Sequence, residues 1–256
     1  MAELLKVNNA SMIFGGLRAV SNLTMQIDEG ELIGLIGPNG AGKTTAFNML
    51  TGVYEPSEGE ITFNGQRING KKPYQVTQMG IARTFQNIRL FSELSVLDNV
   101  KIAFNNQIRY GLAQAIGRFG GYFKEEESIE EKALALLKIF HLEKLRDEMA
   151  KNLPYGEQRR LEIARALATD PGFILLDEPF AGIDPIAVAD IQVMVAHLAR
   201  RGIGVLITDH NVRETLSIVD KAYILSEGKI LLEGSPEMIA NDPVAKKFYL
   251  GEEFRM

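Results

Sequence analysis

The stretch Gly37–Thr45, with the sequence GPNGAGKTT, constrains the fold more than any other part of the chain. It matches the pattern G-x-x-x-x-G-K-[ST] and lies between an apolar run, Leu32–Ile36, and a helix-like segment, Ala46–Leu50. In this strand–turn–helix context the glycines let backbone N–H groups surround a phosphate chain, and the helix N-terminus adds partial positive charge. We therefore predict a triphosphate site formed by Gly37, Pro38, Asn39, Gly40, Ala41, Gly42, Lys43, Thr44 and Thr45, with Lys43 at the terminal phosphates and Thr44 on Mg2+.

Composition limits the classes of function that fit. A chain of 256 residues with 46% hydrophobic and 24% charged residues fits one enlarged α/β unit. The net charge of −5 and the mixing of basic with acidic residues argue against nucleic-acid binding. The absence of cysteine excludes disulfides, thiol catalysis and cysteine metal sites. The sequence has no leader pattern and no apolar run of about 18 residues, so we expect a soluble chain that meets a membrane only through a partner.

Short alternating patterns predict a small antiparallel layer near the N-terminus. Leu4–Phe14 and Leu23–Ile27 read as strands, and Glu60–Phe63 ends in the hairpin turn Asn64-Gly65. Phe14 precedes the pair Gly15-Gly16. Two readings of Phe14 stay open, stacking on a nucleotide base and packing in the core.

The loss of strand-like patterns after residue 86 indicates an inserted helical subdomain. A helix-like segment from Gln75 leads into the predicted strand Gly80–Phe85, and strand patterns then vanish between residues 87 and 153. A helix is predicted at Ile129–Phe140. The acidic cluster Glu125–Glu127 reads as the solvated start of this helix rather than a metal site, and His141 as a capping or surface residue. Between residue 87 and the predicted helix at Ile129, the helical pattern of apolar residues is interrupted by the glycines Gly111, Gly117, Gly120 and Gly121.

Two apolar strands deliver polar residues at their carboxyl ends. Phe173–Leu176 is followed by Asp177-Glu178, and Ile203–Thr208 by Asp209-His210. Ligands of α/β sheets gather at such strand ends. Because buried carboxylates cost several kcal/mol unless a cation or donors compensate them, Mg2+ on phosphates held by the glycine-rich loop explains the acidic pair. The remaining predicted elements are the helices 161–169 and 186–201, with His197 on a polar side, a hairpin of 222–225 and 230–232, and a final helix Pro236–Leu250 before the tail 251–256.

Taken together, these motifs resemble, in order, those of the ATP-binding subunits of ABC transporters. Gly37–Thr45 is similar to the phosphate loop and Leu153–Gln158 to the signature, while Phe173–Glu178 resembles the Walker B strand with its catalytic glutamate. Gln86 matches the glutamine that senses Mg2+ and the membrane partner, and His210 the switch histidine. Ala181–Pro185, which contains Asp184, resembles the dimer-crossing loop.

The resemblance implies a P-loop NTPase of ABC type, with a parallel-sheet core, an antiparallel β subdomain and an inserted helical subdomain. As subdivisions of a single domain we expect residues 1–86, 87–160 and 161–256. It implies a head-to-tail homodimer or heterodimer with two ATP, integral membrane permease partners, and a peripheral location at the cytoplasmic face of the inner membrane. Each ATP would contact one copy's phosphate loop and the other copy's Tyr155, Gly156 and Glu157.

For hydrolysis the resemblance implies distinct roles for a few side chains. Thr44 and Gln86 would ligate Mg2+ directly and Asp177 through its water shell. Glu178 would polarise the attacking water, and His210 would bond the γ-phosphate and orient that water. In the signature, Pro154 and Tyr155 replace the commoner Ser and Gly, so backbone N–H groups are expected to make the contact.

The two ends of the chain resemble different transporter families. Phe14–Val20, Arg83–Phe91 and Leu153–Gly156 are similar to the ATPase of branched-chain amino acid importers, whereas the chain from Phe173 onward is closer to the ATPase of the lipopolysaccharide exporter. A natural intermediate and an engineered chimera both fit this pattern. We expect amino acid uptake, with lipopolysaccharide export, a non-transport ABC ATPase and an ATP-holding regulatory module as alternatives.

Overall fold

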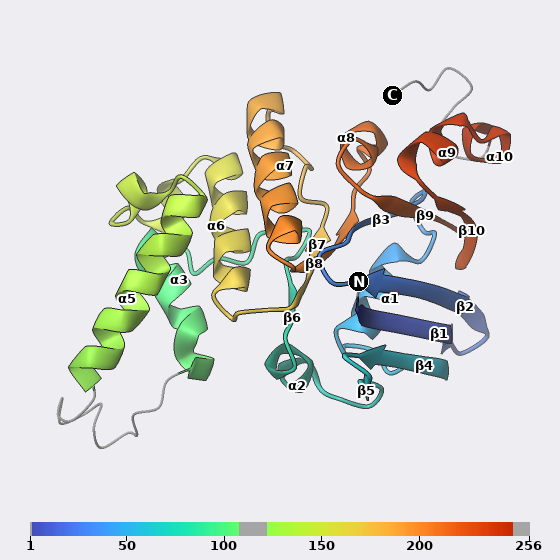
Figure 1. Ribbon diagram of the computed structural model, residues 1–256, viewed down its shortest axis with the longest axis horizontal. Helices are drawn as coiled ribbons and strands as arrows, with labels where there is room; N and C mark the ends of the chain where they lie inside the picture. Colours follow the sequence, from blue (N-terminus) through green and yellow to red (C-terminus); the bar gives the residue numbers. More distant parts are fainter. Residues whose placement is uncertain (1, 108–121, 248–256) are drawn as a thin grey trace. The chain divides into compact units, whose positions relative to one another are not determined.

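The computed structural model describes residues 2–107 and 122–247, and Figure 1 follows the chain through them. These residues divide into two compact units, one of residues 2–86 and 172–247 and the other of residues 87–107 and 122–171. The glycine-rich patch Gly111–Gly121 and the tail 251–256 lie outside the described residues.

The first unit contains a four-stranded antiparallel sheet. Its spatial order is β2 (Leu17–Asp28), β1 (Glu3–Phe14), β4 (Glu58–Phe63) and β5 (Gln66–Arg67). The predicted antiparallel layer and the Asn64-Gly65 hairpin are confirmed. The predicted strand Leu23–Ile27 is too short, because β2 begins at Leu17 and pairs with β1 through the Gly15-Gly16 turn. Asn22, at φ 51°, lies where the β1–β2 register shifts, and such a bulge breaks the alternation that sequence reading depends on.

The second sheet of this unit positions the site. It has six strands in the order β10 (Lys229–Gly234), β9 (Lys221–Ser226), β3 (Leu32–Ile36), β8 (Gly204–Thr208), β7 (Phe173–Asp177) and β6 (Ile81–Arg83). Every pair is parallel except β9–β10, which forms the predicted hairpin. All residues of β3, β7 and β8 are buried. Continuous apolar strands of this kind are typical of a sheet covered on both faces.

In the described part of the first unit, six helices lie around these sheets. They are α1 (Lys43–Leu50), α2 (Pro73–Gln78), α7 (Pro185–Arg200), α8 (Val212–Leu216), α9 (Pro236–Asn241) and α10 (Pro243–Ala245). The core of the unit joins both sheets and α1: Val7 and Met25 from the antiparallel sheet belong to the same buried cluster as Leu35, Phe47 and Leu175. His197 is exposed on α7, as predicted.

The final helix is predicted wrongly as one element. The described chain forms α9 and α10, which are separated at Asp242. Asp242 has φ −69° and ψ 127° and precedes Pro243. A residue before proline is pushed out of the helical region, and proline has no N–H for a helical bond, so the helix cannot continue through this point. The Asp242 side chain instead caps α10 by accepting from the Ala245 amide.

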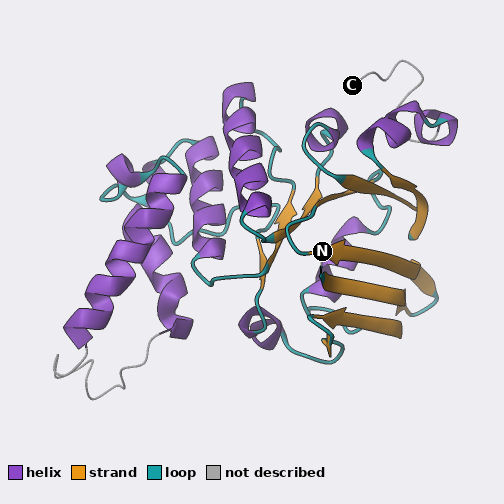
Figure 2. Cartoon of the chain, in the orientation of Figure 1, coloured by secondary structure: helices purple, strands orange, loops and turns teal. Residues whose placement is uncertain are grey.

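The second unit is helical in its described residues, and Figure 2 draws these helices in purple. Its elements are α3 (Val96–Lys101), a 3-10 turn (Ile102–Gln107), α5 (Tyr122–Ile139), two short 3-10 turns (Glu143–Leu145 and Ala150–Asn152) and α6 (Tyr155–Leu167). The unit continues to Pro171 rather than ending at 160, because α6 runs unbroken across that position.

The predicted start of α5 at Ile129 is wrong, because the helix begins seven residues earlier, at Tyr122. Glu125 nevertheless lies in the first turn of the helix, as predicted for the acidic cluster. Acidic residues there are favoured by the partial positive charge of the helix N-terminus. Glu126 forms an ion pair with Lys101 at 3.6 Å. His141 is exposed just beyond the helix, with φ 55°.

Candidate functional site

The carboxyl ends of three adjacent strands converge on one cavity in the first unit. β8 lies between β3 and β7, so the loop after β3, the acidic pair after β7 and His210 after β8 come together. The cavity has a volume of about 690 Å³. Its lining consists of Leu17, Arg18, Ala19, Asn39, Gly40, Ala41, Gly42, Lys43, Thr44, Thr45, Gln86, Glu178, His210, Glu227 and Gly228.

The glycine-rich loop has the backbone that the motif requires at its last glycine. Gly42 caps α1 with φ 105°, a conformation that other residues rarely adopt, and a Cβ there would lie 2.7 Å from the Ala19 carbonyl oxygen. Gly228, in the β9–β10 turn, donates its N–H to the Ala41 carbonyl at 2.9 Å and accepts from the Ser21 amide at 2.7 Å. These contacts fix the loop between the two sheets.

Lys43 is buried at the first position of α1. Its Nζ donates to the carbonyl oxygens of Gly37 at 2.6 Å and Pro38 at 3.0 Å. Gly37 and Pro38 therefore hold the lysine rather than line the cavity. Burial lowers the pKa of Lys43, and the nearby carboxylates of Glu178, Asp177 and Asp209 oppose this shift. A cation that is short of water and held only by carbonyls is well placed to receive an anion.

Glu178 is the acid that faces the cavity. Its Oε1 lies 2.6 Å from His210 Nε2, and its Oε2 accepts from Gln86 Nε2 at 2.9 Å. The Glu178 side chain is only 10% exposed, so these two contacts determine where its carboxylate points. Of the three side chains predicted to act in hydrolysis, Gln86 and His210 thus each contact Glu178 directly.

The backbone of Glu178 has a feature that the sequence does not reveal. Its φ is 52°, in the left-handed region, and its N–H donates to the Thr208 carbonyl at 2.7 Å. Holding a non-glycine residue there costs of order 1 kcal/mol or more. The conformation turns the chain at the end of β7, so that Asp177 and Glu178 contact different partners.

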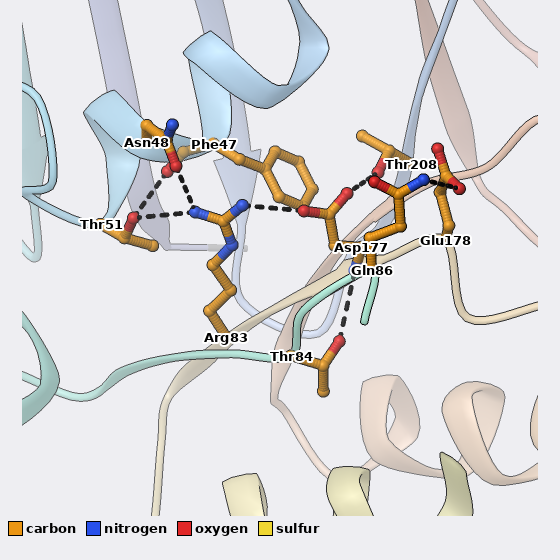
Figure 3. A network of polar contacts seen from close by, with 9 residues as sticks. All are labelled: Phe47, Asn48, Thr51, Arg83, Thr84, Gln86, Asp177, Glu178 and Thr208. Carbon is orange, nitrogen blue, oxygen red and sulfur yellow. Dashed lines mark hydrogen bonds and ion pairs between the residues drawn. The ribbon is translucent and has the colours of Figure 1, made fainter. Parts of the chain in front are cut away.

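Asp177 lies beside an arginine that we did not predict for the site. Its Oδ2 accepts from Arg83 Nη2 at 2.8 Å and its Oδ1 from Thr208 Oγ1 at 3.0 Å. Figure 3 shows the network, in which Arg83 also reaches Asn48 of α1. The only sequence sign of it is an arginine at the end of a strand, Arg83, three residues before Gln86.

Asp209 connects the loops that follow β7 and β8. It is buried and accepts from the amides of Phe180 at 2.9 Å and Asn211 at 2.8 Å. Burial raises the pKa of Asp209, and these two amide bonds oppose the rise. The residue thereby anchors the turns that carry Glu178 and His210.

The residues present fit a magnesium ion that a nucleotide brings with it. Thr44 and Gln86 line the cavity and offer oxygen ligands, whereas Asp177 does not line it. Among residues 2–107 and 122–247, no group of three or more His, Cys, Asp or Glu could hold a metal alone. Mg2+ is characteristically bound by one or two carboxylates together with substrate phosphates and water, so this sparse set of ligands suits it. Direct ligation by Thr44 and Gln86, and water-mediated ligation by Asp177, stay predictions.

Phe14 does not line the cavity. It is 41% exposed, and its ring packs edge-on against Tyr54 with the centroids 5.2 Å apart. The β2 residues Leu17, Arg18 and Ala19 occupy the cavity wall next to the phosphate loop. Sequence reading missed these residues because it began β2 only at Leu23. Base stacking by Phe14 stays a prediction.

Asp184 caps the N-terminus of α7. Its Oδ1 accepts from the amides of Ile186 at 3.1 Å and Ala187 at 3.0 Å. An aspartate in this position satisfies two N–H groups that the helix leaves without partners. Its predicted contact with a nucleotide across a dimer stays a prediction.

The signature residues lie in the second unit, in the first turn of α6. Tyr155 is 44% exposed, and its hydroxyl accepts from Arg159 Nη2 at 3.2 Å. Glu157 forms an ion pair with Arg160 at 3.8 Å, and Gly156 is half-buried. Pro154 provides no side-chain cap, so the first N–H groups of α6 lack one. The predicted trans contact with a nucleotide depends on these N–H groups.

Comparison with known proteins places the chain in a family. The ABC transporter family model matches residues 20–181. The chain is 43% identical to LptB, the lipopolysaccharide export system ATP-binding protein of Escherichia coli K12, over 98% of this chain and 99% of that protein. It is 39% identical to LivG, the high-affinity branched-chain amino acid transport ATP-binding protein of Salmonella typhimurium, over 97% and 98%. Neither likeness is confined to one end of the chain.

Solved structures agree with this assignment. The ADP conformation of MJ1267, an ATP-binding cassette of an ABC transporter, matches with a TM-score of 0.85 and 32% identity, over 98% of this chain and 100% of that one. A dimeric structure of MJ0796, a bacterial ABC transporter cassette, matches with a TM-score of 0.77 and 26% identity, over 91% and 99%. The predicted fold class is thus confirmed. The chain belongs to the ABC transporter family, as an ATP-binding subunit that hydrolyses ATP.

Proposed function

We propose that the chain is the motor subunit of a transporter for branched-chain amino acids and that it hydrolyses Mg2+-bound ATP between two copies arranged head to tail. The observation that carries the hydrolytic part is the Glu178 carboxylate, which is held by Gln86 and His210 at the wall of the cavity that contains Lys43. Phosphoryl transfer to water needs a held phosphate chain and a positioned water, and these residues provide both.

In this proposal each residue has a defined task. Lys43 and the amides of the phosphate loop bind the β- and γ-phosphates. Thr44 and Gln86 would hold Mg2+ directly, and Asp177 would act through its water shell. Mg2+, when bound, neutralises charge on the phosphates and polarises them. Glu178 orients the attacking water and accepts its proton, while His210 holds both the Glu178 carboxylate and the γ-phosphate oxygens.

A dimer and a permease complete the proposed machine. Cassettes of this family dimerise, as the structure of MJ0796 does. In the head-to-tail arrangement, the first N–H groups of α6 at Tyr155, Gly156 and Glu157 contact the ATP of the other copy, and Asp184 lies near the crossing. No helix of the described residues is long and apolar enough to cross a membrane. The location that we propose, at the cytoplasmic face of the inner membrane and bound to integral permease subunits, follows the resemblance to ABC transporter ATPases.

The transported substrate is tested through the permease. Amino acid uptake is supported by the likeness to LivG and by the segment 83–91, whereas the 43% identity with LptB favours lipopolysaccharide export as the second candidate. The chain is co-expressed in turn with the membrane subunits of each type, and co-purification and stimulation of phosphate release are measured. Capture and stimulation by the amino acid permease alone support the proposal, and capture by the exporter alone overturns the substrate.

One exposed aromatic gives this test a matched pair of variants. The resemblance to ABC transporter ATPases implies that the surface around Gln86–Leu97, together with the helical insert, meets the permease. Phe91 is 48% exposed on this surface, and its ring lies 5.6 Å from the Arg165 guanidinium. Tyr74, on α2 of the first unit and outside this surface, is 60% exposed. Phe91→Ala is expected to weaken permease capture, and Tyr74→Ala is not. Equal effects of the two variants count against a docking role for residues 86–97.

A further inference from the structure

Arg83 joins three elements of the nucleotide site. It is the last residue of β6, and its Nη2 donates to Asp177 Oδ2 on β7 at 2.8 Å. Its Nη1 donates to Asn48 Oδ1 on α1 at 2.7 Å and lies 3.4 Å from Thr51 Oγ1. Figure 3 shows the guanidinium between the helix that begins at Lys43 and the strand that ends at Asp177. One side chain therefore sets the spacing of two motifs that are far apart in sequence.

The environment of Arg83 keeps its guanidinium in this position. The side chain is only 8% exposed. Its central carbon lies 5.4 Å from the centroid of the Phe47 ring and 5.2 Å from that of the Phe85 ring. Aromatic rings attract a cation, and arginine offers a planar fork of donors that lysine cannot reproduce. The site thus selects arginine by shape as well as by charge.

The Asp177 carboxylate is oriented from both sides. Arg83 holds Oδ2, and Thr208 Oγ1 donates to Oδ1 at 3.0 Å. The Asp177 backbone N–H donates to Thr84 Oγ1 at 3.3 Å. A carboxylate has about four lone-pair positions, so these bonds leave positions that can accept from metal-bound water. The direction of those free positions depends on Arg83 and Thr208.

Arg83 acts at a distance from the nucleotide. Neither Arg83 nor Asp177 lines the cavity, whereas Gln86 and Glu178 do. Gln86 follows Arg83 by three residues and contacts Glu178, the neighbour of Asp177. The removal of the Arg83 guanidinium therefore disturbs Asp177 without removing any group that touches ATP. An effect on nucleotide binding can therefore pass through the Asp177 carboxylate or through α1, which Arg83 contacts at Asn48.

We propose that Arg83 is a positioning residue that fixes Asp177 relative to α1, and that the Mg2+-dependent part of ATP affinity requires it. The inference rests on the proposed role of Asp177 toward Mg2+. Residues that hold metal ligands from behind typically contribute about 10- to 100-fold in metal affinity. A loss of this size in ATP affinity is expected with Mg2+ present, and no loss with the metal removed.

The test compares ATP affinity in excess Mg2+ with ATP affinity in EDTA, using the full chain. Arg83→Met keeps the length and removes the charge, and about 10- to 100-fold of the Mg2+-dependent affinity should vanish. Arg83→Lys keeps the charge but cannot span Asp177 and Asn48 together, so a partial loss is expected. Arg67→Met is the control, because Arg67 is an exposed arginine of the same unit that pairs with Glu60 at 3.8 Å. Its affinities should match those of the wild type.

Unfolding temperatures of the nucleotide-free variants show whether a loss of ATP affinity comes from a less stable fold or from a displaced Asp177. Equal losses of affinity with and without Mg2+ overturn the inference, and so does full retention of the Mg2+ effect in Arg83→Met. If Arg83→Met does not fold, Asn48→Ala removes the anchor of the guanidinium instead, and a smaller loss of the same Mg2+-dependent kind is expected. A wild-type chain whose ATP affinity ignores Mg2+ overturns the proposed Mg2+ site itself, which is a different result from the failure of Arg83 alone.

Discussion

Glu178→Gln tests the assignment of the hydrolytic carboxylate most directly. The amide keeps the size of the side chain, and its oxygen can still accept from Gln86 Nε2, which lies 2.9 Å from Glu178 Oε2. What is lost is the charge that faces His210 and the ability to take a proton from water. A positioned general base contributes roughly 10²- to 10⁴-fold in rate. At 1.36 kcal/mol per factor of ten this is about 3 to 5 kcal/mol of transition-state stabilisation.

The same contacts indicate that the fold survives. His210 is 45% exposed, so solvent screens its contact with Glu178, and weakening this contact costs about 1 kcal/mol or less. ATP binding should therefore persist while turnover falls roughly 10²- to 10⁴-fold, and a dimer should accumulate with ATP. Steady-state phosphate release, ATP titration and size-exclusion chromatography measure the three effects. Glu60→Gln, the same change at an exposed glutamate of β4, is the control.

A phosphate-release rate for Glu178→Gln within about tenfold of the wild type falls short of the general-base range and refutes the assignment. A loss of ATP affinity as large as the loss of turnover also refutes it, because the contacts of Glu178 are then needed for the ground state. Parallel loss in Glu60→Gln would trace the effect to the protein preparation and not to the site.

Three further predictions concern Lys43, Asp209 and the buried pair of Arg159 and Glu162. Lys43→Ala should abolish most ATP affinity by removing the buried cation at the phosphates, and an unchanged calorimetric titration contradicts this. Burial raises the pKa of Asp209. The stabilisation from Asp209 is therefore full below the ordinary aspartate pKa of about 3.9 and is lost as the pH rises above that value. The Tm of Asp209→Asn minus that of the wild type should rise with pH above about 3.9, and a difference that falls with pH contradicts the prediction. Arg159 and Glu162 form a buried pair at 2.8 Å, so Arg159→Leu should cost about 3 to 5 kcal/mol in urea unfolding and the added change Glu162→Leu should restore much of it, whereas additive losses disprove the coupling.

The sequence predicts correctly those strands whose apolar composition agrees with their buried place in the sheet. The apolar strands β3, β7 and β8 are each followed at once by a chemical motif, and the structure buries all of their residues. The order of the motifs also pointed to the family. Boundaries failed where a single residue changes the pattern: the register shift near Asn22 hid the first half of β2, and Pro243 divides the predicted last helix.

The sequence predicts which residues belong to the candidate site, but it does not predict which of them contact one another. Pairing of Gln86 and His210 with Glu178 depends on the strand order, which a linear pattern does not contain. The one sign of Arg83 in the sequence is its place near a strand end, where arginine is commonly a surface residue. Its burial follows only from the positions of Asn48 and Asp177. Leu17, Arg18 and Ala19 were missed for the same reason as the start of β2.

At Glu178 the backbone conformation and the catalytic role favour different residue types. Glycine or asparagine would adopt φ 52° at lower cost than glutamate does. Either of them would also take the carboxylate away from Gln86 and His210. Selection for a more stable chain and selection for a working ATPase thus favour different residues at this position. A screen for thermal stability alone, applied to this protein, would tend to collect inactive variants here.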